Sequence, residues 1–133
     1  MILLDTHAAI WLANDDSALG GQSRQMILAA RAESRLALSA ISFWEMALLV
    51  SKGRIELRDA PGMLREQLLG SGVTEIPLTG DIGLLAVELE DLHGDPADRF
   101  IAATAIAYDA TLMTADNRLL RWQSQLRRQN ASR

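Results

Sequence analysis

The chain has 133 residues, of which 49% are hydrophobic and 23% charged, so it is long enough for one sizeable hydrophobic core and too short for two ordinary domains. It has no cysteine, which excludes a disulfide framework and a thiolate metal site. The net charge of −4 argues against a protein that coats nucleic acid by bulk electrostatic attraction, although no acidic residue follows Asp116 and the C-terminal end is rich in arginine.

In the first half of the chain, short apolar runs alternate with helical patterns. Residues 2–4 are typical of a buried strand and precede a helix that Thr6 is expected to cap. No basic region precedes this run and no apolar stretch is as long as a membrane span, so we expect a cytoplasmic protein without membrane contact. A helix after Gly20, a second strand over 36–38 and a helix from Ser42 to about Gly53 are expected to follow.

The second half repeats this alternation. We expect a helix over 60–69, an edge strand over 73–78, a helix over 79–92, an alanine-rich helix from Pro96, a fourth strand over 111–113 and a last helix after Asp116. Parallel neighbours require crossover connections, so the predicted fold class is α/β with a mostly parallel sheet that is covered on both faces. We assign residues 1–126 to one domain and residues 127–133 to a basic, poorly ordered C-terminal tail.

Four acidic residues lie where the predicted strands end or the predicted helices begin. Asp5 directly follows the first strand, and Asp116 comes shortly after the fourth. Glu45 lies in the first turn of the helix after the second strand, and Asp98 in the first turn of the helix that leads into the fourth. Because ligand sites of open parallel sheets lie beyond the carboxyl ends of the strands, these four side chains could converge at one edge of the sheet.

Each of these acids also has a purely structural explanation. Acidic residues at helix starts accept hydrogen bonds from free amides and complement the helix dipole. Residues 42–45 have the pattern of a capping box and Asp116 is suited to an N-cap, so taken singly Glu45 and Asp116 favour the structural interpretation. Asp5 favours it less, because an acid at the end of an apolar strand must find a partner or bear the cost of desolvation.

Taken together, the four carboxylates have the chemistry of a Mg²⁺ or Mn²⁺ site, since both ions prefer oxygen ligands. A bound divalent ion would offset the repulsion that clustered carboxylates otherwise suffer. Sites of this kind hydrolyse phosphodiesters by activating water and neutralising the scissile phosphate. His7 is expected to have a structural role. His93 could act as a general base or order the turn before Pro96, and the sequence assigns it no catalytic role.

In their order and spacing these residues resemble the PIN-domain family and, within it, the VapC-type toxins of bacterial toxin–antitoxin pairs. The resemblance covers nearly the whole chain and rests on residues 3–6 (LLDT), 42–45 (SFWE), 52–54 (KGR), 93–99 (HGDPADR), 101–105 (IAATA) and 114–116 (TAD). One departure is the segment 122–126 (WQSQL), which does not show the short final strand often found in the fold.

The resemblance implies a PIN-like three-layer α/β/α sandwich with a central sheet of four or five short strands. It also implies Mg²⁺- or Mn²⁺-dependent endoribonuclease activity on an RNA substrate, a homodimer, and a cognate antitoxin protein as partner. By position, it implies that Asp5, Glu45, Asp98 and Asp116 are catalytic and that Asp5, Asp98 and Asp116 hold the metal. Thr6 and Thr114 match supporting polar positions, and Asp95 is a further supporting acid whose preferred role is helix capping.

Two other functions remain open at the level of sequence. The first is a phosphatase-like enzyme with Asp5 as the nucleophile, which is disfavoured because no second acid lies two residues further on. The second is a non-catalytic module that binds RNA or a protein, in which the acids only cap helices.

Overall fold

The computed structural model describes residues 1–133 and contains one five-stranded sheet in which every strand pairing is parallel. The predicted parallel sheet is therefore confirmed, and its central strand, β1, pairs with β2 on one side and β4 on the other. The strand order is β3-β2-β1-β4-β5, with β1 at Ile2–Leu4, β2 at Leu36–Ser39, β3 at Thr74–Ile76, β4 at Thr111–Thr114 and β5 at Arg128–Asn130.

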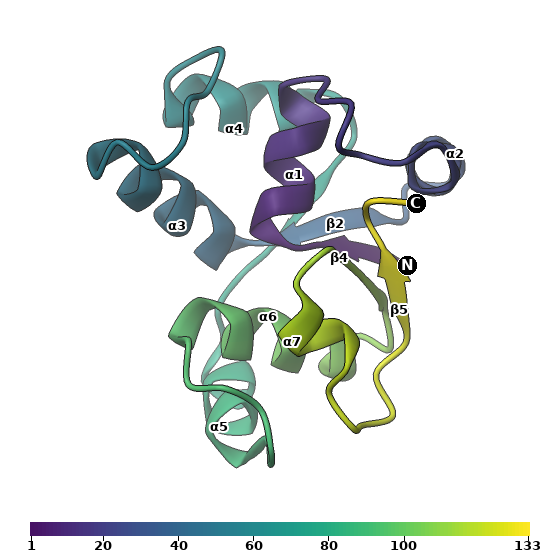
Figure 1. Ribbon diagram of the computed structural model, residues 1–133, viewed down its shortest axis with the longest axis vertical. Helices are drawn as coiled ribbons and strands as arrows, with labels where there is room; N and C mark the ends of the chain where they lie inside the picture. The colour runs from purple at the N-terminus through teal and green to yellow at the C-terminus, as the bar shows by residue number, and fades with distance from the viewer.

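Helices cover both faces of this sheet, so the expected three-layer sandwich is confirmed (Figure 1). Side chains of successive strand residues point to opposite faces. Leu4 accordingly packs in a core with the helices of one layer, and Leu3 packs in a separate core with those of the other. The first layer holds α1 (Thr6–Ala13), α2 (Gly21–Ala32), α3 (Ala40–Ser51) and α4 (Pro61–Gly70), and the second holds α5 (Gly80–Glu88), α6 (Pro96–Ala107) and α7 (Asn117–Leu120). None of these helices combines the length and the apolar character that a membrane crossing requires.

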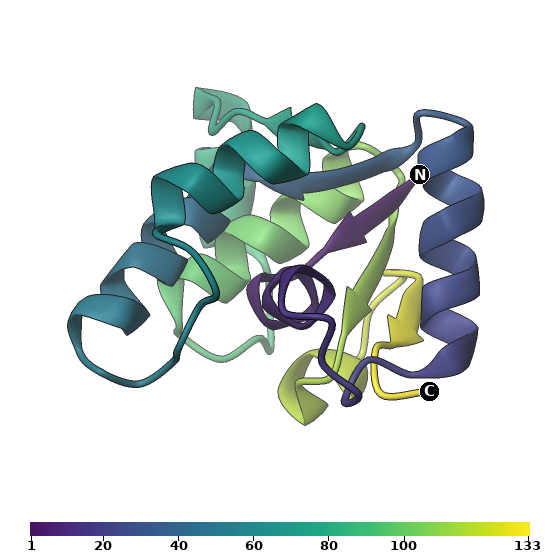
Figure 2. The same ribbon diagram turned by 90° about the horizontal axis from the view of Figure 1, so that it is seen from above.

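The domain does not end at residue 126, as predicted, because the last strand follows that point. Residues 128–130 pair with β4, and the main chain around them donates and accepts regular hydrogen bonds, including one of 2.9 Å from Ala131 to Thr114. Figure 2 shows this strand and the C-terminus beside α2. The strand is polar and lies at a sheet edge, where main-chain pairing rather than side-chain burial holds it, so the sequence carries no apolar signal for it.

Two helices begin at other residues than predicted. Asp5, and not Thr6, is the N-cap of α1, since its Oδ1 accepts a hydrogen bond of 2.8 Å from the backbone N–H of Ala8. Helix α3 begins at Ala40 and is capped by Ser39, so the capping box expected at residues 42–45 does not exist. The strand β2 passes into α3 without a loop, which moves the helix start toward the N-terminus and buries Ser42 inside the helix.

Candidate active site

A pocket with a volume of about 180 Å³ lies at the carboxyl end of the central strands, and we refer to it as the acidic pocket. All four carboxylates that the sequence singles out line it, although they come from four separate parts of the chain. Thr6 and Asp95 line it as well, whereas Thr114 is buried at the end of β4, where its side chain forms a hydrogen bond with Asp5. The complete lining is Asp5, Thr6, His7, Glu45, Leu49, Asp95, Asp98, Asp116 and Arg118.

Asp5 is the most deeply buried acid of the pocket, with an exposed fraction of only 5%. Burial raises the pKa of its carboxyl group from 3.8 to about 6, because the ionised form loses its hydration. Hydrogen bonds from the Thr114 side chain and from the backbone N–H of Ala8 oppose this rise only in part. Asp5 is thus a buried anion that no basic side chain pairs with directly, which is the environment that a bound cation would stabilise.

Glu45 lies in the second turn of α3 and points into the acidic pocket. Because α3 begins at Ala40, helix capping does not explain the presence of an acid at this position. Burial raises the pKa of Glu45, and the nearby charges of Asp98 and Asp95 add to the rise, whereas the Thr6 side chain lowers it. The capping role that the sequence suggests for Glu45 is therefore wrong.

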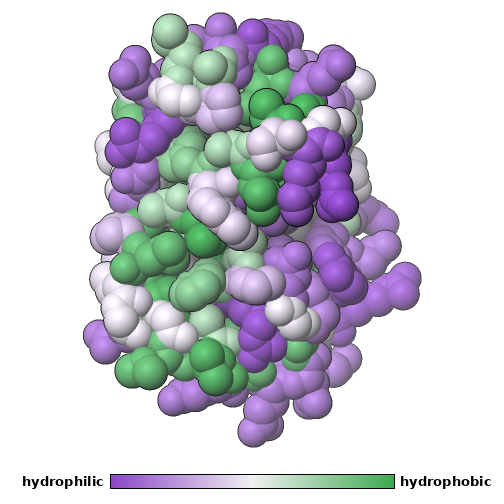
Figure 3. All heavy atoms as spheres, turned by 90° about the vertical axis from the view of Figure 1, so that its left-hand side faces the viewer, coloured by the Kyte–Doolittle hydropathy of each residue, from purple (hydrophilic) through white to green (hydrophobic).

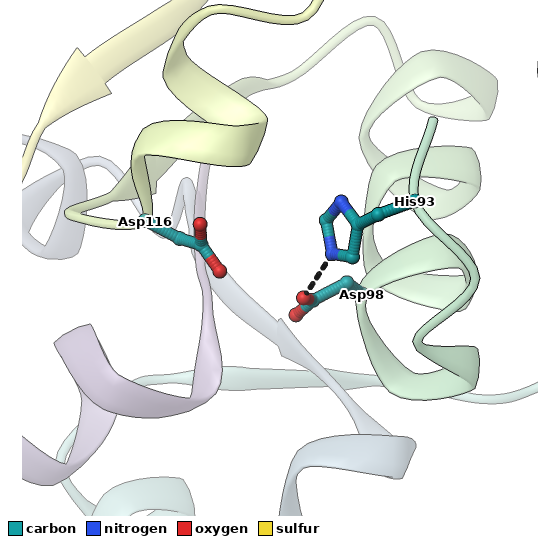
Figure 4. Close-up of side chains that lie close together, drawn as sticks. All are labelled: His93, Asp98 and Asp116. Atoms are coloured by element: carbon teal, nitrogen blue, oxygen red, sulfur yellow. Dashed lines mark hydrogen bonds and ion pairs between the residues drawn. The ribbon is translucent and has the colours of Figure 1, made fainter. Parts of the chain in front are cut away.

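Asp98 lies in the first turn of α6 and contacts a histidine that was not predicted to belong to the site. The Nε2 atom of His93 lies 2.6 Å from Oδ2 of Asp98, as Figure 4 shows. Burial raises the pKa of Asp98, and the hydrogen bond with His93 opposes the rise. An ionised carboxylate only accepts hydrogen bonds, so Nε2 carries the proton in this pair. The backbone N–H of Asp98 in turn donates to Asp95, which is the N-cap of α6, as preferred from the sequence.

Asp116 faces the same space from the other side and caps α7 (Figure 4). Its two carboxylate oxygens accept hydrogen bonds of 3.2 and 2.8 Å from Arg118, and this guanidinium holds the pKa of Asp116 below its ordinary value. Arg118 also reaches to 3.6 Å from Oδ2 of Asp98. The sequence placed Arg118 only among the basic C-terminal residues, although its position two residues after the acid is the signal that could have connected the two.

The loop that carries His93 is held by Arg99, one residue after Asp98. The guanidinium of Arg99 donates hydrogen bonds to five backbone carbonyls at the end of α5 and in the loop that follows, those of Ala86, Val87, Leu89, Leu92 and His93. One planar cation therefore fixes both the end of α5 and the backbone of His93. Because Arg99 and Asp98 lie in the same helical turn, the position of His93 is coupled to that of its carboxylate partner.

Several features of the acidic pocket fit a divalent cation. His93, Asp98 and Asp116 can each offer one ligand atom within a group that spans no more than 4.8 Å. Carboxylate oxygens are the ligands that Mg²⁺ and Mn²⁺ prefer, and imidazole nitrogen is not a usual Mg²⁺ ligand. Burial is the largest cause of the raised pKa values of Asp5, Glu45 and Asp98, and repulsion between the neighbouring carboxylates adds to each rise. A bound cation would relieve this repulsion. The donor set is therefore that of a hard-metal site.

Comparison with known proteins connects this site to one family. The PIN domain family matches residues 2–123. Ribonuclease VapC22 of Mycobacterium tuberculosis (strain ATCC 25618 / H37Rv) is 38% identical over 119 residues, which cover 89% of this chain and 88% of that protein.

Solved structures share the fold at lower sequence identity. A VapBC2 complex from Rickettsia felis, bound to a DNA fragment from its promoter, superposes with a TM-score of 0.71 at 22% identity and with 98% of both chains covered. A DNA-bound VapBC from Salmonella typhimurium gives a TM-score of 0.68 at 18% identity and covers 96% of both chains.

Proposed function

The chain belongs to the PIN domain family, and from this premise we propose that it is a metal-dependent endoribonuclease that acts as the toxin of a toxin–antitoxin pair. The observation that carries the proposal is the convergence of Asp5, Glu45, Asp98 and Asp116 in the acidic pocket, from four separate elements of the fold. The relative from Mycobacterium tuberculosis, which is named a ribonuclease, supports the reaction class.

In this proposal Asp5, Asp98 and Asp116 hold the metal, which is Mg²⁺ or Mn²⁺. The bound ion would neutralise the scissile phosphate and lower the pKa of a water molecule. The chain's own residues prepare the ligands: His93 orients Asp98 through the contact of 2.6 Å, and the hydroxyl of Thr114 accepts a hydrogen bond of 3.0 Å from the backbone N–H of Asp116. Arg118 partly neutralises Asp116 and Asp98, and a bound metal would take over this role.

Glu45 is the carboxylate best suited to accept the proton of the attacking water. Its pKa is raised by burial, which makes it a stronger base than an ordinary glutamate, and its side chain is only partly buried. Thr6 supports this position. Its hydroxyl lies 3.1 Å from the hydroxyl of Ser42 on α3, and a hydrogen bond from the Thr6 side chain to Glu45 opposes the rise in the pKa of that carboxyl group. Glu45 thus acts on the proton, whereas the three aspartates act on the metal.

We further propose that a cognate antitoxin inhibits the enzyme and that the active form is a homodimer. Structural neighbours of this chain occur in toxin–antitoxin complexes, among them one from Klebsiella pneumoniae. A hollow of about 330 Å³ between α1, α2 and α4 has Leu12 and the largely buried Leu64 and Leu68 at its floor. Arg31, Arg58 and Asp15 also line it, and with two cations against one acid it would fit a helical antitoxin segment that carries acidic residues. Amide exchange with and without the antitoxin tests this contact, which should protect the three helices.

The phosphatase alternative fits the geometry less well. The Oδ1 atom of Asp5 is engaged in capping α1, and the residue is only 5% exposed, so it is poorly placed for an in-line attack on phosphorus. The residue two positions further on, where a second acid is needed, is His7. Small phosphoesters should therefore not be hydrolysed at a rate comparable to RNA.

The proposal is tested with purified, antitoxin-free protein and RNA in the presence of Mg²⁺, Mn²⁺ or EDTA. We expect cleavage with either metal, none with EDTA, and unchanged cleavage by the control variant Asp81→Asn, whose acid is exposed in the first turn of α5 and remote from the acidic pocket. Binding of RNA without cleavage under any metal condition would favour the non-catalytic module instead.

A further inference from the structure

We propose that a second hollow, next to the acidic pocket, is a subsite for a nucleotide of single-stranded RNA that flanks the scissile phosphate. Trp44 would stack on the base, and Lys52 and Arg54 would bind the backbone phosphate. This inference rests on the proposed ribonuclease function and names residues that determine how the substrate is held. We refer to this second site as the flanking hollow.

The flanking hollow has a volume of about 250 Å³ and shares part of its wall with the acidic pocket. Glu45 and Asp95 line both spaces, so the two are contiguous. The remaining wall comes mainly from α3 and from the turn after it, with Trp44, Leu48, Lys52 and Arg54. A strand of RNA whose phosphate lies at the acidic pocket would therefore place a neighbouring nucleotide against these side chains.

Trp44 is the tryptophan of this chain that is available for stacking. Its exposed fraction is 54%, whereas Trp122 is 7% exposed and its ring N–H donates to the backbone carbonyl of Glu90. Trp11 packs against the hydrophobic core of the first helix layer. Hydrophobic side chains gather on the side of the molecule that carries α3 (Figure 3). Because every base has a π face, an exposed indole beside a cleavage site can hold a nucleotide without selecting its sequence.

Lys52 and Arg54 supply positive charge that is not paired with the carboxylates of the acidic pocket. Both are exposed, and neither forms an ion pair, so their charges are free to attract a phosphate. Arg118, on the opposite side of the pocket, is instead paired with Asp116. An RNA backbone that approaches several carboxylates meets repulsion, and unpaired cations on the path of the strand offset it.

The end of α3 holds these two cations in place. Gly53 lies between them with a φ of +68°, a left-handed conformation that glycine adopts without strain. The backbone N–H of Arg54 donates to the carbonyl of Leu49 at 2.9 Å, so the turn is closed onto the last turn of the helix. Lys52 and Arg54 are thus carried by an ordered helix end and not by a free loop.

The test measures binding of a fluorescein-labelled, single-stranded RNA of mixed sequence to variants built on Asp98→Asn, so that the RNA stays intact. Lys52→Gln and Arg54→Gln should each weaken binding and reduce the slope of log Kd against log salt concentration by roughly 0.7. The matched control is Arg35→Gln, which removes an exposed arginine just before β2, at the opposite end of the sheet. This control should leave the slope unchanged.

Stacking is tested by Trp44→Ala, which should weaken binding roughly 5-fold or more, and by Trp44→Phe, which should restore most of the loss. Tyr108→Ala is the matched control, since Tyr108 is 45% exposed at the far end of α6. In the cleavage-competent protein, Trp44→Ala should raise KM and leave kcat nearly unchanged. Thermal melting of each variant confirms that these surface substitutions leave the fold intact.

Two results would overturn the inference. One is an effect of Lys52→Gln and Arg54→Gln no larger than that of Arg35→Gln. The other is a change of oligomeric state on size exclusion with Trp44→Ala while RNA binding stays the same, which would assign the patch to contact with a second copy of the chain. RNA binding is measured separately from RNA cleavage. If the wild-type protein fails to cleave RNA, the proposed function is contradicted, and the binding measurements still test the flanking hollow.

Discussion

Replacing Asp5 by asparagine is expected to stabilise the metal-free protein at neutral pH while removing its activity. The asparagine Oδ1 can still accept the hydrogen bond from Ala8 that caps α1, so the change mainly removes a buried charge. The variant therefore separates what the carboxylate costs the fold from what it contributes to the proposed metal site.

The magnitude follows from the raised pKa of Asp5. The carboxyl group titrates near 6 in the folded chain and at 3.8 when it is unperturbed, so between these values the folded state binds more protons than the unfolded state. Stability of the wild type therefore falls as the pH rises through this interval. At about 1.4 kcal/mol per pH unit, the loss is about 3 kcal/mol and is complete once the pH is above the folded value. Asparagine has no proton to release, so the variant escapes this loss.

Urea unfolding in EDTA at about pH 4 and about pH 7 measures the difference. The free energy of unfolding of Asp5→Asn, relative to wild type, should increase between the two pH values by about 2 kcal/mol, because at about pH 4 the unfolded carboxyl group is already partly ionised. Added Mn²⁺ should raise the stability of the wild type and leave that of the variant nearly unchanged, because the proposed site needs the Asp5 carboxylate beside Asp98 and Asp116 and an amide does not replace it. An Asp5→Asn variant without any gain at neutral pH would refute the reasoning, since the buried charge would then cost nothing. Asp81→Asn serves as the control with an exposed acid.

Three other substitutions test single features of the structure. Arg99→Lys should lower the free energy of unfolding by about 1.5 to 3 kcal/mol, because an ammonium group cannot reproduce five hydrogen bonds to backbone carbonyls. Urea unfolding measures this loss, and a loss smaller than that caused by the same substitution at an exposed arginine would contradict it. Arg118→Gln should tighten Mn²⁺ binding by up to about 5-fold in calorimetry, since it removes the cation that competes for Asp116; weaker binding would instead mean that Arg118 supports the metal site. Gly20→Ala should destabilise the fold by about 1 to 3 kcal/mol, because a Cβ there would clash with the backbone of Arg133; an unchanged melting temperature would show that the close approach of the two segments is not needed.

The order of strands and helices and the edge where the carboxylates meet could be predicted because both depend on local signals. Short apolar runs mark β1, β2 and β4, and the acids that follow them in sequence must lie beyond the carboxyl ends of parallel strands. The structure places Asp5, Glu45, Asp98 and Asp116 in one pocket, and the roles assigned to them remain a proposal.

Features that depend on tertiary contact were missed. The strand β5 is polar and is held by main-chain pairing at a sheet edge, so no hydrophobic pattern reveals it. The start of α3 was misplaced because Ser39 and Ser42 are both plausible caps, and only the end of β2 decides between them. The contact of His93 with Asp98 depends on how Arg99 folds the preceding loop, which residue spacing does not encode.

The most direct test of the account measures RNA cleavage and Mn²⁺ affinity side by side on antitoxin-free wild type, Asp5→Asn and Asp98→Asn. We predict that the wild type binds the ion and cleaves RNA, and that both variants lose the two properties together while circular dichroism shows a native fold. Metal-dependent cleavage by both folded variants would contradict the assignment of the acidic pocket as the active site.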